Sequence, residues 1–325
     1  SKDIILEAIE NSLLAACKNQ FGKSENIRVN IDRETGEVKV FADYEVVEDD
    51  MIEDDALQIG ITEAKLRFRD DVEVGEKVST EVTPKNFGRI AAQKAKQVVV
   101  QKIREEERKV LYVQYLEKER EVITGIVQRY SGKNVCINLG RVDAILMESE
   151  QVRGEHFRPT EHIKLYVVEV KDTPKGPRIT VSRSHPEFVK RLFEEEVTEI
   201  QDGIVTIESI AREAGSRTKI AVSTVDPNVD AVGACVGMNG SRVNAIVNEL
   251  RGEKIDIVNW SDMPEIFIEN ALSPAVVMDV SIDEYEKTAR VIVPENQLSL
   301  AIGKEGQNAR LAAKLTGYKI DIKCE

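Results

Sequence analysis

The fold of this chain is decided by one short stretch, AIGKEGQNARLAAKL (Ala301–Leu315), in which two glycines open a helix-forming run. A glycine inside a helix costs about 1 kcal/mol relative to alanine, so Gly303 and Gly306 need a physical reason. Either the chain turns sharply here, or another molecule must approach the backbone closely.

The same pattern occurs once more, earlier in the chain. Residues 219–258 and 289–323 both read as strand, helix, Gly-x-x-Gly, helix, glycine-punctuated turn and strand. Gly237 precedes Gly303 by 66 residues, and the two KIDI stretches that close the copies are 65 residues apart. One Gly-x-x-Gly is a weak signal, because turns between helices often contain glycine. Two copies with matched flanks indicate an internal duplication.

The duplicated pattern is typical of KH domains, in which a Gly-x-x-Gly loop clamps the backbone of about four nucleotides. A loop without side chains lets phosphates reach its N–H groups, and the N-terminus of the following helix adds a favourable dipole. The predicted RNA-binding residues are Gly237, Met238, Asn239, Gly240 and Arg242 in the first repeat, and Gly303, Lys304, Glu305, Gly306, Arg310 and Lys314 in the second.

The two loops differ in charge. The second loop carries Lys304, offset by Glu305, whereas the first carries no cation. The loops also suggest a test: changing both Gly303 and Gly306 to aspartate should weaken RNA binding with little loss of stability, because each change puts a negative charge where phosphate is expected.

Residues 121–184 contain five short strand candidates, which predict a small closed barrel of the oligonucleotide-binding type. With 12 basic and 9 acidic side chains, residues 118–184 are the only basic segment of a chain whose net charge is −13. Rings on such a barrel can stack bases while cations follow the phosphates; the alternative is that rings such as Phe157 and Tyr166 belong to the core. The predicted RNA-binding residues of the barrel are Arg129, Tyr130, Lys133 and Arg183.

The N-terminal residues predict a domain of mixed helices and strands, called the head below. Helical spacing over residues 3–21 and two strand patterns, Asn26–Asp32 and Glu37–Val47, precede an acidic run, Glu48–Asp55, that we interpret as a solvated loop. A single long helix is predicted from Asn86 to about Glu119. Its apolar face carries Phe87, Ala91, Ala95 and Val98, with Arg89, Lys96 and Arg104 opposite.

Composition excludes several classes of protein. Apolar residues make up 42% of the 325 residues, charged residues 32% and aromatic residues 5%, which suits a modular protein better than one large enzyme core. No apolar run approaches the length of a membrane span, and the N-terminus reads as an acidic amphipathic helix rather than a signal peptide. The four cysteines and three histidines match no zinc pattern. We therefore expect no metal, no cofactor and no catalytic residues.

The order of these segments resembles one known family. A head with FGRIAAQ (Phe87–Gln93), an S1-type barrel and two KH domains is similar to the NusA family of bacterial transcription termination/antitermination factors. The resemblance covers essentially the whole chain and is carried further by GEHFRPTEHIKLYVVEV, VSRSHPEFVKRLFEEEVTEI, AREAGSRTKIAVSTVD and VGACVGMNGSRVNAIVNELRGEKIDIVNW.

The resemblance implies a multidomain α+β protein with an S1 (OB-type) β-barrel and two prokaryotic-type KH domains. The implied boundaries are 1–119 for an RNA-polymerase-binding domain, 120–184 for the S1 barrel, and 185–258 and 259–325 for the KH domains. It also implies a cytoplasmic, monomeric elongation factor, not an enzyme, that binds core RNA polymerase, nascent single-stranded RNA and other Nus factors, and modulates pausing, termination and antitermination. The family's polymerase- or hairpin-facing basic residues match Arg89, Lys94, Lys96, Lys102 and Arg104.

The sequence departs from the family at two points. The first KH loop of the family often holds a basic residue, whereas here Asn239 can hydrogen-bond a phosphate without adding charge, so that Arg242 is expected to supply it. Some relatives carry acidic C-terminal repeats that inhibit RNA binding; because the sequence ends just after the second repeat, we expect no such inhibition.

Two other classes of protein remain open. S1 and KH modules also occur in RNA-processing enzymes and their accessory proteins, which would need an acidic metal-binding constellation elsewhere. A ribosome-associated KH protein is the third possibility. Binding to core polymerase, divalent-dependent RNA degradation and co-sedimentation with small ribosomal subunits distinguish the three.

Overall fold

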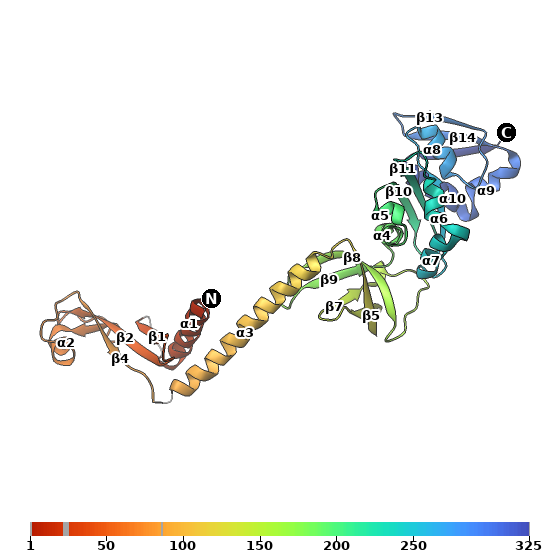
Figure 1. Ribbon diagram of the computed structural model, residues 1–325. Coiled ribbons are helices and arrows are strands. Elements are labelled where there is room, and N and C mark those ends of the chain that lie inside the picture. Colours follow the sequence, from red (N-terminus) through yellow and green to blue (C-terminus); the bar gives the residue numbers. More distant parts are fainter. Residues whose placement is uncertain (1, 22–25, 86, 325) are drawn as a thin grey trace. The chain divides into compact units, whose positions relative to one another are not determined.

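The computed structural model describes residues 2–21, 26–85 and 87–324. The chain forms two compact units, residues 1–109 and 110–325, and each is described by itself (Figure 1).

The first unit is a sheet covered by helices. Strand β2 pairs with all three other strands of this sheet, antiparallel with β1 and β4 and parallel with β3. Its core lies where α1 and the start of α3 pack over β1 and β2, through Leu13, Val40, Phe87 and Ala91. The elements are α1 (Lys2–Phe21), β1 (Ile27–Ile31), β2 (Val38–Val47), β3 (Gln58–Gly60), α2 (Ile61–Arg67), β4 (Lys77–Glu81) and α3 (Phe87–Leu116).

The helix and strand predictions for the head are confirmed, although Asn86 lies outside the described residues. Ala95 and Val98 continue the buried face of α3 as its spacing predicted. The acidic run Glu48–Asp55 is a largely exposed loop between β2 and β3, also as predicted. The sequence did not predict β3, α2 or β4. Elements of three and seven residues leave too few turns or alternations to show a period, and the five residues of β4 include a single strongly apolar side chain, Val78.

The second unit begins with the end of α3, whose Tyr115 packs into a closed barrel and donates a hydrogen bond to the Leu139 carbonyl oxygen at 2.8 Å. The barrel has the strand order β5-β6-β7-β9-β8, which confirms the predicted five-stranded closure. Its strands are β5 (Val122–Ser131), β6 (Asn134–Asn138), β7 (Asp143–Leu146), β8 (His162–Lys171) and β9 (Arg178–Ser182), with the one-turn helix η1 (Glu148–Glu150) between β7 and β8.

The two repeats follow with the same topology. Each is a helix, an antiparallel strand pair, two helices around a glycine loop, and a third strand parallel to the second, which confirms the prokaryotic KH arrangement. The first repeat consists of α4 (Pro186–Glu196), α5 (Thr198–Gln201), β10 (Val205–Glu213), β11 (Arg217–Thr224), α6 (Ala231–Val236), η2 (Met238–Gly240), α7 (Ser241–Glu249) and β12 (Lys254–Asn259). The second consists of α8 (Pro264–Ala271), β13 (Asp279–Asp283), β14 (Thr288–Val293), η3 (Glu295–Gln297), α9 (Leu298–Ile302), η4 (Lys304–Gly306), α10 (Gln307–Thr316) and β15 (Lys319–Cys324).

One hydrophobic core joins the two repeats. Helix α10 of the second repeat packs on β10 and β11 of the first, and the cluster around Leu311 and Ala312 includes Ala211, Ala221 and Val258 of the first repeat. In Figure 1, α10 lies beside these strands. The sheet of the first repeat is therefore covered on both faces, since its own helices cover the other one.

Candidate nucleic-acid interface

The two glycine loops have the same backbone conformation. Gly237 has φ 74° and ψ 172° and Gly303 has φ 76° and ψ 172°, while Gly240 and Gly306 are left-handed at φ 76° and φ 75°. In both loops the last glycine N–H donates to the carbonyl oxygen of the first glycine at 3.1 Å. The matched spacing in the sequence therefore corresponds to two copies of one turn.

Each loop leads directly into a helix that is not capped by any side chain among the described residues. The N-cap residues of α7 and α10 are Gly240 and Gly306, and neither helix start receives a side-chain hydrogen bond. The first N–H groups of a helix carry a partial positive charge. Between the glycines, Met238 is 84% exposed and Lys304 and Glu305 are exposed. The arrangement suits an anion that approaches the backbone itself.

The glycines of a loop are not equivalent. A Cβ on Gly303 would lie 2.8 Å from the backbone nitrogen and the Cβ of Asn308, whereas a Cβ on Gly306 would meet nothing closer than Arg310 Nη1 at 3.9 Å. The prediction that aspartate at both positions costs little stability is therefore wrong for Gly303. Its φ and ψ lie in a region that only glycine adopts without strain, and its neighbour is backbone.

Arg242 ties two helices together behind the first loop. Its Nη1 donates to the Ala234 carbonyl oxygen in α6 at 2.6 Å and to Glu199 Oε2 at 2.8 Å. Asn308 occupies the matching position of the second repeat, where its Nδ2 donates to the carbonyl oxygens of Ala301 and Leu272, each at 3.0 Å. The Arg242 guanidinium, predicted to contact RNA, thus already has protein partners.

Arg310 connects the second loop to the first repeat. Its Nε donates to Glu213 Oε1 at 2.5 Å, and its Nη1 donates to the Glu305 carbonyl oxygen within the loop at 3.1 Å. The hydrogen bond from Arg310 holds the pKa of the Glu213 carboxyl below its usual value. Gln307 reinforces this contact by donating to Glu213 Oε2 at 2.9 Å.

Two predicted cations of the second repeat lie open to solvent. Lys304 and Lys314 are exposed, and neither makes an ion pair with any described residue. On α10 and the loop before it, they offer positive charge that a phosphate could meet without displacing a carboxylate.

Three of the four predicted barrel residues lie on the β5–β6 hairpin. Arg129 and Tyr130 are exposed on β5, and the Tyr130 hydroxyl accepts a hydrogen bond from the Phe157 N–H at 3.0 Å. Lys133 pairs with Glu148 at 2.9 Å on the surface. Phe157 and Tyr166 are 4% and 5% exposed, so the core alternative is confirmed for these two rings.

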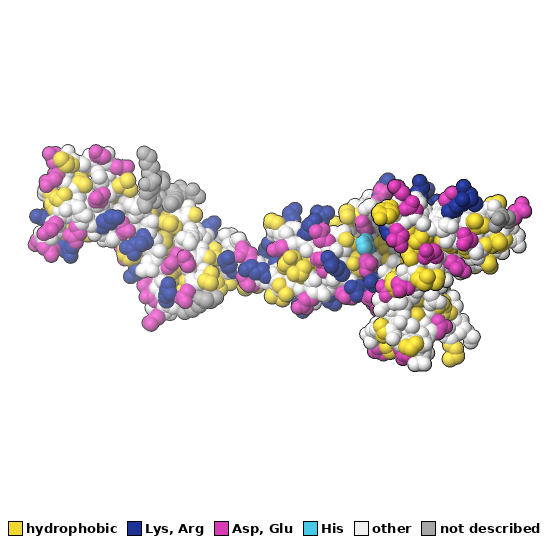
Figure 2. Space-filling model, turned by 90° about the horizontal axis from the view of Figure 1, so that it is seen from above, with side chains coloured by type: hydrophobic (Ala, Val, Ile, Leu, Met, Phe, Trp, Pro, Cys, Tyr) yellow, Lys and Arg dark blue, Asp and Glu magenta, His cyan; other side chains and the backbone are white. Residues whose placement is uncertain are grey.

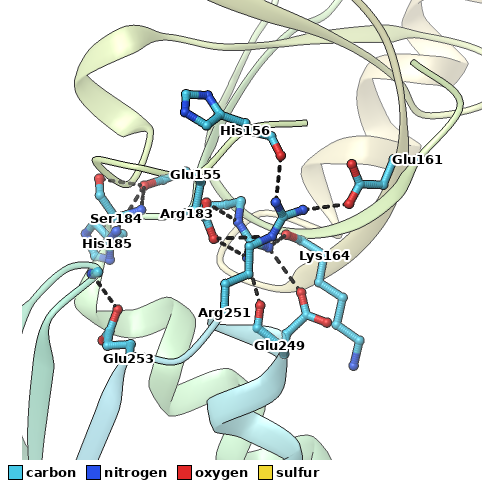
Figure 3. Close-up of polar contacts among 12 residues, drawn as sticks. Glu155, His156, Glu161, Lys164, Arg183, Ser184, His185, Glu249, Arg251 and Glu253 are labelled. Atoms are coloured by element: carbon cyan, nitrogen blue, oxygen red, sulfur yellow. Dashed lines mark hydrogen bonds and ion pairs between the residues drawn. The ribbon is translucent and has the colours of Figure 1, made fainter. Parts of the chain in front are cut away.

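Arg183 is buried at the joint between the barrel and the first repeat. It is 1% exposed and donates to both oxygens of Glu155, at 2.7 and 2.8 Å, and to Glu249 Oε1 at 3.1 Å. Figure 3 shows its guanidinium enclosed among these groups, with Arg251 beside it reaching from the α7–β12 turn to Glu161 and to the His156 carbonyl oxygen. Although predicted to contact RNA, Arg183 is not accessible to RNA in this structure.

The predicted polymerase-facing residues lie along α3. Arg89, Lys96 and Arg104 are exposed, and Lys94 is half-buried. Lys102 pairs with Glu105 at 2.8 Å. On the face seen in Figure 2, Lys and Arg side chains alternate with Asp and Glu side chains rather than forming one large basic patch.

The described residues hold no group of three His, Cys, Asp or Glu side chains placed to bind a metal ion. Among the described helices, none is both long enough and apolar enough to cross a membrane. Cys17, Cys136, Cys235 and Cys324 are free thiols.

The sequence did not predict the carboxylates that pair with the arginines near the two loops. Glu199 and Glu213 lie 43 and 97 residues from Arg242 and Arg310, and a single sequence holds no signal for a pair so distant. It also missed the pair between Lys219 and Asp256, at 3.1 Å, in which the buried Lys219 Nζ also donates to the Ser273 carbonyl oxygen of the second repeat.

Family models match three parts of the chain. They describe the NusA N-terminal domain (residues 1–109), the NusA-like first KH domain (183–260) and the NusA-like second KH domain (264–325).

Relatives match along the whole chain. The transcription termination/antitermination protein NusA of Bacillus subtilis strain 168 is 56% identical over 325 residues, which are 100% of this chain and 87% of that protein. The protein of the same name from Halalkalibacterium halodurans is 54% identical over 325 residues, 100% of this chain and 84% of that protein. A solution structure of the N-terminal domain of NusA from B. subtilis matches 33% of this chain and 85% of that chain, at 52% identity and a TM-score of 0.31.

Proposed function

Because this chain belongs to the NusA family of transcription termination/antitermination proteins, we propose that it binds RNA polymerase and nascent single-stranded RNA and modulates pausing, termination and antitermination. Within this proposal the chain is a monomer without catalytic activity that works with other Nus and termination factors. The predicted domain boundaries, 1–119, 120–184, 185–258 and 259–325, are part of it.

The main support for the proposed RNA binding is the pair of glycine loops. They share one backbone conformation, open onto uncapped helices and belong to repeats joined by a single core. Backbone N–H groups and helix N-termini bind phosphate without regard to base sequence, which suits a protein that meets many transcripts.

The charges near the loops support a modest electrostatic contribution. Arg242 and Arg310 have carboxylate partners, so Lys304 supplies the unpaired charge within the second loop, and Lys314 adds a second one in the last turn of α10. For single strands the slope of log K against log salt is about −0.7 per neutralised phosphate. We therefore expect RNA binding to weaken only gently with salt.

The polymerase part of the proposal rests on the head. Its sequence matches the NusA N-terminal domain, and α3 presents Arg89, Lys96 and Arg104 to solvent. We assign these cations, with Lys94 and Lys102, to contact with polymerase or with the RNA hairpin of a paused complex.

The test combines binding and transcription. The purified chain is mixed with core polymerase and analysed by gel filtration, and pause lifetimes are then measured on a template with a hairpin-dependent pause. Co-elution and a longer pause are expected. A matched variant with Arg89, Lys96 and Arg104 changed to glutamate should lose the effect while RNA affinity, measured by fluorescence anisotropy, is retained.

A chain that neither co-elutes with core polymerase nor changes pause lifetimes would contradict the proposal. Sedimentation with small ribosomal subunits, or divalent-dependent degradation of RNA by the pure chain, would favour the two alternative classes instead.

A further inference from the structure

The single tryptophan of the chain lies on the surface between the two repeats. Trp260 directly follows β12 and is 39% exposed. Its backbone N–H donates to the Val222 carbonyl oxygen at 2.8 Å, and one side of its ring contacts Phe267, with centroids 6.5 Å apart. Its indole N–H donates no hydrogen bond within the described residues. A large ring held in place yet open to solvent is available to a ligand.

Trp260 lines a hollow of about 430 Å³. The hollow lies where the parallel strands β11 and β12 end and α6 begins, and its lining includes Thr224, Asp230, Asn259 and Asp262. Its size falls within the usual range of small-ligand sites, about 300–1,000 Å³.

The polar lining selects the kind of ligand. Asp230 and Asp262 line the hollow, and their carboxylates accept no hydrogen bond from any described residue. None of the lining residues is lysine or arginine, so no cation would attract a phosphate there, while the two carboxylates would repel it. Carboxylates accept hydrogen bonds from amino groups. The favoured ligand is therefore a flat ring bearing an exocyclic amine.

The hollow is also close to the first glycine loop, Gly237–Gly240. Helix α6 begins beside the hollow at Ala231 and ends at Val236, directly before Gly237, the first glycine of the loop. Its six residues rise about 9 Å, which lies within the reach of the roughly four nucleotides that a KH loop holds. A strand whose phosphates lie on the loop can thus place one base over Trp260.

We propose that Trp260 is a base-stacking platform of this interface, and that Asp230 and Asp262 favour adenine, cytosine or guanine over uracil there. The inference rests on the proposed RNA binding and adds a base-selective subsite at the junction of the two repeats. Aromatic stacking tolerates every base, so the selectivity comes from the two carboxylates, since uracil has no exocyclic amine.

The lone tryptophan makes the test direct. The whole chain is titrated with 12-nucleotide oligo(A) and oligo(U), each 5′-labelled for anisotropy in one series and unlabelled for tryptophan emission in another. We expect oligo(A) to quench the emission and to bind more tightly than oligo(U). Because Trp260 is the single tryptophan of the chain, a change in tryptophan emission reports on the surroundings of this residue.

Three variants sharpen the result. Trp260→Ala should weaken oligo(A) binding by about 5- to 150-fold, the range for loss of one stacked base. Tyr285→Ala is the matched control, because Tyr285 is 100% exposed and lies outside the hollow; its affinity should equal that of the unmodified chain. Asp230→Asn should reduce the preference for oligo(A) over oligo(U).

Binding of oligo(A) by anisotropy with unchanged tryptophan emission would overturn the inference and leave the proposed function intact. Equal affinities of the Trp260→Ala and Tyr285→Ala variants would also overturn it. If no oligonucleotide binds at all, the proposed RNA binding itself fails, and the inference fails with it. Should Trp260→Ala not fold, the emission of the unmodified chain still decides.

Discussion

Arginine side chains have different roles in this chain, and the burial of each side chain decides its role. Arg183 is 1% exposed and enclosed by carboxylates, Arg310 is half-exposed and joins two repeats, and Arg129 is exposed on the barrel. A buried charge must be paired, because its desolvation costs several kcal/mol. The sequence shows the charge of each residue but not its burial.

Removing the Arg183 side chain should destabilise the second unit. Arg183→Ala leaves Glu155, whose side chain is 5% exposed, without its bidentate partner, and breaking a buried pair in this way costs about 3–5 kcal/mol. Urea unfolding followed by circular dichroism measures the loss. The control is Arg129→Ala on the exposed strand, where a change below about 0.5 kcal/mol is expected; equal effects of the two variants would refute the assignment.

Asp256 should make stability depend on pH in the acid range. Burial would raise the pKa of its carboxyl, but hydrogen bonds and charge from Arg217 and Lys219 outweigh this and hold the pKa below its usual value. A carboxyl with a lowered folded pKa stabilises the fold above its unfolded pKa of about 3.9, and this contribution is lost as the pH falls through the folded value.

The Asp256 contribution is measured by comparing urea unfolding of the unmodified chain and Asp256→Asn between pH 6 and pH 2.5. The variant should be less stable at pH 6, and the difference should shrink as the pH falls below about 4. A constant difference across this range would show that Asp256 contributes through packing rather than through its charge.

At the scale of elements, each glycine loop is one turn with two distinct glycines. In both loops the first glycine has a backbone conformation that only glycine adopts, against the start of the next helix. The second glycine is left-handed in both, but the space around it differs: a Cβ on Gly306 would meet nothing closer than 3.9 Å, whereas a Cβ on Gly240 would lie 3.0 Å from Asn244 Nδ2. Mutations of the two positions therefore test different properties of the loop, namely its fold and its access to phosphate.

Gly306→Asp should reduce RNA affinity without unfolding the loop. It adds a carboxylate at the start of α10, where phosphate is proposed to bind, and we expect at least about a 10-fold loss, as for one charge-assisted hydrogen bond. Gly306→Asn is the matched control, because asparagine tolerates left-handed backbone and carries no charge. Anisotropy with labelled single-stranded RNA measures both, and equal losses would count against a phosphate at this loop.

Gly303→Ala should instead lower stability. Its Cβ would lie 2.8 Å from the Asn308 nitrogen, and strained backbone of this kind costs about 1–3 kcal/mol. Thermal unfolding of this variant beside Gly306→Ala separates the two glycines. A stability loss confined to Gly306→Ala would contradict the geometry described here.

At the scale of the whole molecule, the two repeats share one hydrophobic core. Their common core contains Leu311 and Ala312 from α10 and Ala211 and Ala221 from the first repeat. Lys219 and Arg310 add polar contacts across the same junction. The relative position of the two glycine loops is therefore held by packing, not by a linker.

A substitution that destabilises the core of the second repeat should also destabilise the first repeat. Leu311→Ala removes a fully buried side chain, which costs about 2–5 kcal/mol, and amide hydrogen exchange should then become faster in β11 as well as in β14. Leu13→Ala, an equally buried change in the head, should leave β11 unaffected. Unchanged protection of β11 in the Leu311→Ala variant would show that the repeats unfold independently.

Sequence patterns predicted the architecture well because each pattern is local. The duplicated glycine loops, the five short strands and the helical face of Phe87 and Ala91 all express a repeat or a period that neighbouring residues reveal. The same reasoning assigned Arg242 and Arg183 to RNA contact because both are cations near predicted sites. Their partners, Glu199 and Glu155, lie far from them in the sequence, so no local sequence pattern predicts these pairs.

The sequence by itself determined the family, the order of domains and the position of both glycine turns, since turn geometry follows from the few residues that form the turn. Only the tertiary structure decided which charges remain available, because desolvation and ion pairing depend on groups far apart in the chain. It also placed Trp260 over an acidic hollow at the junction of the repeats. The stretch Ala301–Leu315 thus specifies a turn, while the fold around it decides that Lys304 is open to solvent and Arg310 is paired.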